Sequence, residues 1–264
     1  MTHHTQSNPH STHTPNQQKQ QLRGIKLRSL LKQSTAGLIA LSIGILTPIA
    51  SQAQEILLDE DFSRSAKGTF LEHSSESEWH ADKGRLIIGN GRALNGQALG
   101  YAPNRTWANQ TYYKNLNATL APGEAVEVSF SAAVKTDASP EFYIYAMRLN
   151  DGDNSIQIQV KGGKDAPVVT IESVLNNKKT QAEITSASYY ETSESAGLVA
   201  VAMLVTENSA QAYYDRNGKG EWIAIGEPVA CQLSTLDRVQ LKYYSMGFWS
   251  AMDDLKVAIG KPGQ

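Results

Sequence analysis

Hydrophobic and polar residues alternate along most of the chain from about residue 54 onward. Alternation with a period of two is typical of β-strands that bury one face. The clearest runs cover residues 125–134, 141–149, 155–160, 168–174, 198–205, 211–214, 222–225, 238–244 and 255–259. No stretch of this region sustains a helical stripe over three turns. The pattern therefore predicts an all-β fold, an antiparallel β-sandwich or jelly roll.

Turn-forming residues fill the joints between these runs. Examples are NDGDN at 150–154, GGKD at 162–165, LNNK at 175–178 and DRNGKG at 215–220. Asn, Asp and Gly favour tight turns because they tolerate positive φ or bond to nearby backbone. DRNGKG is similar to half of a calcium loop, but Lys219 and Gly226 stand where ligands are required, so we interpret it as a hairpin turn. No internal repeat or linker interrupts residues 54–264, which we expect to form a single domain.

Residues 1–53 have a different character from the rest of the chain. LRGIKLRSLLK at 22–32 carries positive charge, and the uncharged segment that follows is apolar for about fourteen residues and ends in Ser51-Gln52-Ala53. This succession is that of a secretory signal peptide with a long n-region, cut after Ala53. An uncleaved membrane anchor is the alternative, but a span needs about 20 apolar residues. We expect a secreted, periplasmic or cell-envelope protein, and no later segment has spanning length.

Charge and cysteine content narrow the classes of partner. The chain has 24 basic and 26 acidic residues. The predicted leader holds five basic residues and no acidic one, so the remainder has 19 basic and 26 acidic residues and a net charge of −7. Nucleic-acid binding needs a basic face that displaces counterions, and this balance argues against it. Cys231 is alone, so an intramolecular disulfide is excluded; a buried apolar role is expected, with a reactive thiol as the alternative.

Five segments occur in an order that is similar to a known superfamily. They are LLDEDFSRS (57–65), WHADKGRLIIGNG (79–91), YYDRNGKGEWIAIG (213–226), LSTLDRVQLKYY (233–244) and MDDLKVAIG (252–260). Together they resemble the laminin G-like members of the concanavalin A-like lectin/glucanase superfamily. The resemblance implies two curved antiparallel sheets, first and last strands that lie near one another, and a concave face that binds carbohydrate in many members.

Catalytic carboxylates are not predicted. Glycosidases of this superfamily carry an E-x-D-x-x-E or E-x-D-x-E strand motif, and the sequence contains neither. The nearest approach is ESEWHAD at 76–82, where Glu76, Glu78, His80 and Asp82 would project from one side of a strand and Trp79 from the other. The resemblance places Trp79 inward, which leaves these acids as a polar face toward solvent.

Acidic residues gather at both ends of the predicted domain. Asp253 and Asp254 precede the final run, in which Leu255, Val257 and Ile259 share the inward face. If the first and last strands are neighbours, Asp61 and Asp253 are candidate ligands for a structural Ca²⁺, an ion that prefers six to eight oxygen ligands. The alternative is that these acids are solvated strand ends.

Aromatic residues supply the candidate ligand site. Trp107, Tyr112 and Tyr113 lie in YAPNRTWANQTYYKN (101–115), a polar, Asn-rich segment with weak strand character. Aromatic rings stack on the apolar faces of sugars, and amides bond to sugar hydroxyls. We therefore predict a polysaccharide or glycan site here, with plugging of the sandwich edge as the alternative role of these rings.

Three functions are compatible with these observations. The first is an exported, non-catalytic carbohydrate-binding or adhesion module. The second is a polysaccharide-degrading glycosidase or lyase with an unrecognised site, and the third is a structural envelope or matrix protein. The missing glycosidase motif favours the first and the third, between which the sequence does not decide.

The signal-peptide prediction has a direct test. N-terminal sequencing of the exported protein should begin at or within a few residues of Gln54, because signal peptidase cuts after the small-x-small motif. Recovery of an exported protein that still carries residues 1–53 would contradict the prediction.

Overall fold

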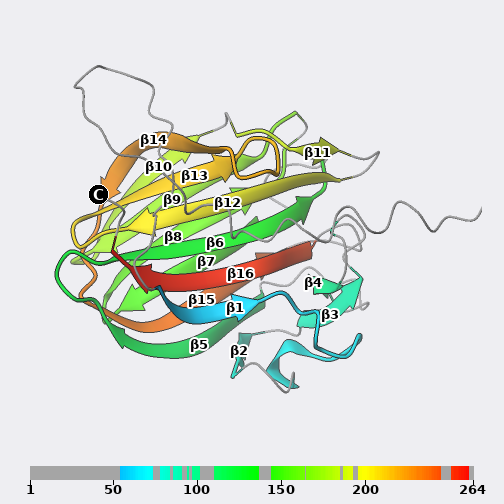
Figure 1. Ribbon diagram of the computed structural model, residues 1–264, viewed down its shortest axis with the longest axis horizontal. Helices are drawn as coiled ribbons and strands as arrows, with labels where there is room; N and C mark the ends of the chain where they lie inside the picture. Colours follow the sequence, from blue (N-terminus) through cyan, green and yellow to red (C-terminus); the bar gives the residue numbers. More distant parts are fainter. Residues whose placement is uncertain are drawn as a thin grey trace, which may run out of the picture.

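Two antiparallel β-sheets packed face to face form the protein (Figure 1), as the alternating pattern predicts. The computed structural model describes residues 54–73, 78–83, 86–90, 94, 97–101, 110–136, 144–163, 165–184, 187–192, 196–244 and 251–261. Within them the only helical element is one 3-10 turn, η2 (Leu71–His73). No described helix has the length and apolar character needed to cross a bilayer.

The nine-stranded sheet contains both ends of the described domain. Its main order is β14-β13-β12-β6-β16-β4-β3, with β1 paired to β16 and β11 paired to β12. The strands are β1 (Glu55–Glu60), β3 (Leu86–Asn90), β4 (Gln97–Tyr101), β6 (Ala125–Val134), β11 (Glu191–Thr192), β12 (Gly197–Val205), β13 (Ser209–Asp215), β14 (Trp222–Ala230) and β16 (Ala251–Gly260). The first and last strands are therefore neighbours, as the resemblance implies (Figure 1).

The seven-stranded sheet has the order β10-β9-β8-β7-β15-β5-β2. The strands are β2 (His80–Lys83), β5 (Gln110–Thr119), β7 (Ile144–Asp151), β8 (Asn154–Lys161), β9 (Val168–Leu175), β10 (Lys178–Ile184) and β15 (Thr235–Tyr244). Four of them, β7 to β10, follow one another as hairpins. Two-residue turns join β7 to β8 and β9 to β10 and fix the register of these pairs.

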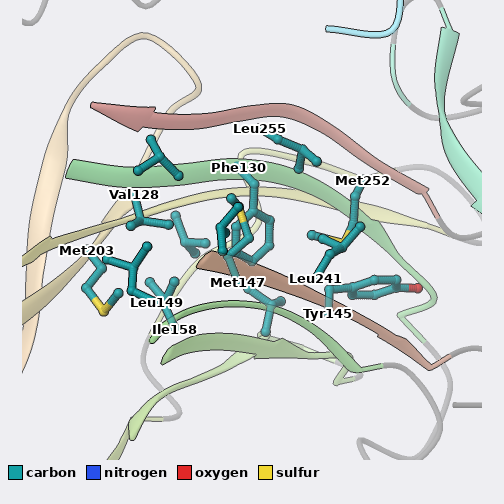
Figure 2. Packing of buried hydrophobic residues seen from close by; sticks show 14 of the residues in the cluster. Val128, Phe130, Tyr145, Met147, Leu149, Ile158, Met203, Leu241, Met252 and Leu255 are labelled. Carbon is teal, nitrogen blue, oxygen red and sulfur yellow. The ribbon is translucent and has the colours of Figure 1, made fainter. Parts of the chain in front are cut away.

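The core lies between the sheets and is built by alternate residues of each strand. Val128 and Phe130 on β6 face Met147 and Leu241 from the other sheet (Figure 2). All four side chains are buried. Burial of each such side chain contributes about 1.5–3 kcal/mol, so this interlayer contact is the main source of stability.

A β-bulge interrupts the alternation of β16. Asp253 pairs with Ser131 and Lys256 pairs with Ser129, so two residues, Asp254 and Leu255, share the one position between these pairs. Asp254 takes a left-handed φ of 52°, which Asp tolerates better than most residues. The extra residue turns both Met252 and Leu255 into the core (Figure 2) and leaves the two aspartates on the outer side.

The segment around Tyr112 corrects one sequence prediction. Gln110–Thr119 is a ten-residue strand, β5, with a bulge at its far end, although its polar composition indicates little strand character. Its pairing with β15 on one side and β2 on the other places Tyr112 inward and Tyr113 outward. Tyr112 is fully buried, so the prediction that it lines an exposed binding face is wrong. The hydroxyl group of Tyr112 is satisfied at the edge of the core, because its Oη accepts a hydrogen bond from the Leu86 amide and donates one to Glu72.

Other local predictions are confirmed. All nine alternating runs lie within or overlap strands. DRNGKG forms the β13–β14 hairpin turn, where the Asp215 carboxylate accepts hydrogen bonds from the backbone amides of Asn217, Gly220 and Glu221. Trp79 and Cys231 are buried, and burial raises the pKa of the Cys231 thiol to about 11. This thiol is therefore a packing group.

Candidate functional site

One residue from every strand of the seven-stranded sheet forms a continuous line across its outer face. The cross-strand partners are His80 on β2, Tyr113 on β5, Gln240 on β15, Arg148 on β7, Gln157 on β8, Glu172 on β9 and Gln181 on β10. We call these seven residues the outer row. Each is polar, charged or aromatic with a polar atom. With strands about 4.8 Å apart, the row spans roughly 30 Å.

The residues one position further along each strand form the matching inner row. Its members are Ala81, Tyr112, Leu241, Met147, Ile158, Ile171 and Ala182. Five of them belong to the main hydrophobic core and Ala182 packs against it. Ala81, at the end of the row, is exposed. Because side chains alternate between faces, burial of the five core members holds their outer-row neighbours on the solvent side.

A hollow of about 220 Å³ lies at the centre of this face. It is lined by Thr111, Ala146, Arg148, Gln157, Gln240 and Lys242. Arg148, Gln157 and Gln240 belong to the outer row, and the other three occupy the next line of outward positions on β5, β7 and β15. Ala146 is 1% exposed, and its small side chain leaves room between longer neighbours. The hollow thus has a small apolar floor and polar walls.

Hydrogen bonds and ion pairs order the polar walls. The Arg148 guanidinium donates from Nε (3.0 Å) and Nη2 (2.7 Å) to Oε1 of Gln157. Glu172 lies 3.8 Å from Arg148 Nη2 and 2.6 Å from Lys179 Nζ. Exposed ion pairs contribute little free energy, but this network fixes the direction in which Arg148 and Gln157 present their remaining polar atoms.

An aromatic pair closes one end of the outer row. The rings of Tyr113 and His80 are stacked with centroids 5.1 Å apart and an interplanar angle of 28°. The Arg238 guanidinium lies over the Tyr113 ring at 5.5 Å from its centroid, within cation–π range. Tyr113 is only partly buried. The structure therefore brings one predicted ring onto the face that carries the hollow.

The three ring residues predicted from the sequence have different outcomes. Trp107 lies outside the described residues, so its role stays a prediction. Tyr112 belongs to the inner row, and Tyr113 to the outer row. Sequence reasoning missed Arg148, Gln157, Gln240 and Lys242, although each is an outward position of a predicted strand. The available signal is the polar half of the alternation in the predicted strands.

The acidic residues of the two chain ends meet on the other sheet. Pairing of β1 with β16 sets Glu60 opposite Leu255, so Asp61 leaves the sheet beside Asp253 and Asp254. Asp253 is 8% exposed, and its desolvation, together with repulsion from Asp254 and Asp61, raises the pKa of its carboxyl to about 8. Asp254 reaches the surface, yet desolvation raises the pKa of this carboxyl as well, opposed by a hydrogen bond from Ser131.

The calcium prediction gains no geometric support from these contacts. Asp61 accepts hydrogen bonds from the amide (3.0 Å) and hydroxyl (2.7 Å) of Ser63, which lower the pKa of its carboxyl. In the part of the chain that the structure describes, no group of three or more His, Cys, Asp or Glu side chains is placed to hold a metal ion. A Ca²⁺ shared by Asp61 and Asp253 stays a prediction.

Comparison with known proteins identifies the fold. An endo-1,3-β-glucanase from Streptomyces sioyaensis is similar with a TM-score of 0.54 and 12% identity, over 79% of this chain and 97% of that one. A carbohydrate esterase from the Shiga toxin-encoding bacteriophage phi24B is similar with a TM-score of 0.50 and 10% identity, over 79% and 100% of the two chains. The fold is a concanavalin A-like jelly roll. No family model and no curated protein matches the sequence, and the laminin G-like type stays a prediction.

The raised pKa of Asp253 predicts a specific pH dependence of stability. Between the unfolded pKa near 4 and the folded pKa of about 8, the folded state binds more protons, so the free energy of unfolding should fall as pH rises through this window. One pKa unit corresponds to about 1.4 kcal/mol. Asp253→Asn should remove most of the fall and should be more stable than the wild type at pH 8, measured by urea unfolding at pH 5 and pH 8. Glu227→Gln, an exposed acid of the same sheet, is the control. Equal pH slopes in the wild type and Asp253→Asn would contradict the assignment.

Proposed function

We propose that the protein is an exported, non-catalytic carbohydrate-binding module that holds a polysaccharide along the outer row. The observation that carries the proposal is the unbroken line of polar and aromatic side chains across all seven strands. A row of roughly 30 Å suits a chain of several sugar units better than a single small ligand. The predicted leader supports export.

The chemistry of the row matches that of a saccharide. The aromatic end of the row, where the Tyr113 ring packs against His80 and Arg238, offers apolar ring edges beside polar groups. The glutamine amides offer hydrogen-bond donors to sugar hydroxyl groups, although the Gln157 oxygen already accepts two hydrogen bonds from Arg148. Gln157 and the neighbouring Gln159 are 6% and 8% exposed. Side chains held this firmly lose little conformational entropy on binding, which favours affinity.

The two proteins of similar fold support carbohydrate as the class of ligand. By their names, the Streptomyces enzyme acts on a 1,3-β-glucan and the bacteriophage protein is a carbohydrate esterase. The fold is thus used elsewhere for carbohydrate chemistry, although a shared fold alone does not transfer an activity. The site chemistry of this chain therefore carries the proposal.

The small number of acidic residues in the outer row favours binding without hydrolysis. Hydrolysis of a glycosidic bond normally uses two carboxyl groups, about 5–10 Å apart, on either side of the bond. Within the outer row Glu172 is the one carboxylate, and its oxygens are engaged by Lys179 and Arg148. Asp253 and Asp254 lie on the opposite sheet, so they do not supply a second acid to this face.

The proposal is tested by removing the aromatic end of the row. A glycan array first identifies a bound polysaccharide, and titration calorimetry then compares the wild type with Tyr113→Ala. Loss of the Tyr113 ring, against which His80 and Arg238 pack, should weaken binding by roughly tenfold, with a small change in melting temperature, because Tyr113 is partly exposed.

Tyr213→Ala is the matched control. Tyr213 is a partly buried tyrosine on the outer side of the nine-stranded sheet, where it packs beside Ala200 and Trp222. Its replacement should leave the affinity unchanged. An array without a hit for the wild type, or equal affinities for a folded Tyr113→Ala variant and the wild type, would overturn the proposal.

A further inference from the structure

We infer that the polysaccharide held on the outer row is acidic, and that Arg148 and Lys242 bind its carboxylate or sulfate groups in the central hollow. The inference rests on the proposed function and specifies its ligand. It comes from the position and partners of the basic side chains around the hollow.

Arg148 and Lys242 are diagonal neighbours on adjacent strands. Gln240 is the partner of Arg148, and Lys242 lies two residues further along β15 on the same face. Diagonal pairs of this kind have backbone positions about 7–8 Å apart, a distance that long side chains span easily. Both residues line the hollow together with the amides of Gln157 and Gln240. A single anionic group seated there can contact a guanidinium, an ammonium and an amide donor at once.

The charges around this pair do not balance. Arg148, Lys161 and Lys179 act on the Lys242 ammonium as like charges, against the single carboxylate of Glu172. Among the described side chains that act on one another here, Lys242 included, four cations share one acid, whereas the whole chain has a net charge of −2. The positive charge is therefore concentrated on the face that carries the outer row.

Lys242 has no ion-pair partner among the described side chains. Glu172 lies 2.6 Å from Lys179 and 3.8 Å from Arg148, and no described side chain forms a hydrogen bond or an ion pair with Lys242. Desolvation, followed by repulsion from Arg148, lowers the pKa of Lys242. A partly desolvated ammonium with no partner costs free energy, which a bound anion would recover.

The surrounding surface favours a saccharide over a nucleic acid as the source of the anion. The hollow is continuous with amide side chains that suit hydroxyl groups, and the whole chain carries more acidic than basic residues. Tight binding of a phosphate backbone requires many basic contacts along its length. A few cations in one hollow suit anionic groups spaced along a sugar chain.

The test compares polysaccharides that differ only in charge. Calorimetry would measure the affinity of the protein for oligogalacturonate and its carboxyl-reduced form, and for a sulfated galactan oligosaccharide and its desulfated form. In at least one pair the acidic form should bind about tenfold or more tightly than the neutral form, because charge-assisted hydrogen bonds are the stronger ones. That preference should shrink when the ionic strength rises.

Lys242→Gln should remove most of the preference and leave the affinity for the neutral form unchanged. Lys219→Gln, which alters a lysine in the β13–β14 turn of the other sheet, is the matched control and should behave as the wild type. A melting curve checks that both variants are folded. Preference for oligogalacturonate alone would identify a uronate ligand, and preference for the sulfated galactan alone a sulfate ester.

Three outcomes would overturn the inference, and they separate it from the proposed function. Equal affinities for neutral and acidic forms would overturn the acidic ligand and leave carbohydrate binding intact. If Lys242→Gln does not reduce the preference for the acidic form, the hollow is not the site that produces this preference. Tighter binding of a DNA duplex than of either acidic oligosaccharide, lost in Lys242→Gln, would replace the saccharide by a nucleic acid. Absence of binding to any polysaccharide, including those of the glycan array, would instead overturn the proposed function itself.

Discussion

The register of the seven-stranded sheet is the constraint on which the binding face depends. The strand pairs must align so that Tyr112 and the other core members of the inner row are buried and the outer row meets solvent, and a slip by one residue would exchange Tyr112 and Tyr113. Two carboxylates help to fix this alignment. Asp151, at the end of β7, accepts a hydrogen bond from the Ser234 amide (2.7 Å) before β15 begins, and Asp237 accepts one from the Gly152 amide (2.8 Å). The core and these contacts specify the same register.

In the nine-stranded sheet, the last strand must accommodate two consecutive aspartates beside the first strand. Two consecutive aspartates in a central strand would normally force one carboxylate into the core, because side chains alternate. The bulge at Asp254 avoids this, since Met252 and Leu255 both point inward and both acids stay outside. Burial of Asp253, together with its repulsion by Asp254 and Asp61, still costs free energy, which appears as the raised pKa of Asp253. The paired aspartates are therefore a consequence of how β16 closes the sheet beside β1.

The sequence predicted the fold class and most strands because alternation is a local property. It failed for β5, where Thr111, Tyr113 and Asn115 face outward and give the segment a polar composition although Tyr112 is fully buried. It also missed the outer row, because Arg148, Gln157 and Gln240 come from separate parts of the chain and only the pairing of strands brings them together. Nothing local to Lys242 indicates that it shares a hollow with Arg148. Such sites depend on long-range register, which a single sequence does not reveal.

Mapping of the ligand contact by NMR tests the central claim most directly. Titration of the isotopically labelled protein with a polysaccharide that it binds should shift the backbone amides of β5, β15, β7 and β8 most strongly, at and beside Tyr113, Gln240, Arg148 and Gln157. The amides around Asp253 and Asp254 on the opposite sheet should change little. Large shifts confined to the nine-stranded sheet, with the outer row unaffected, would contradict the account and place the site elsewhere.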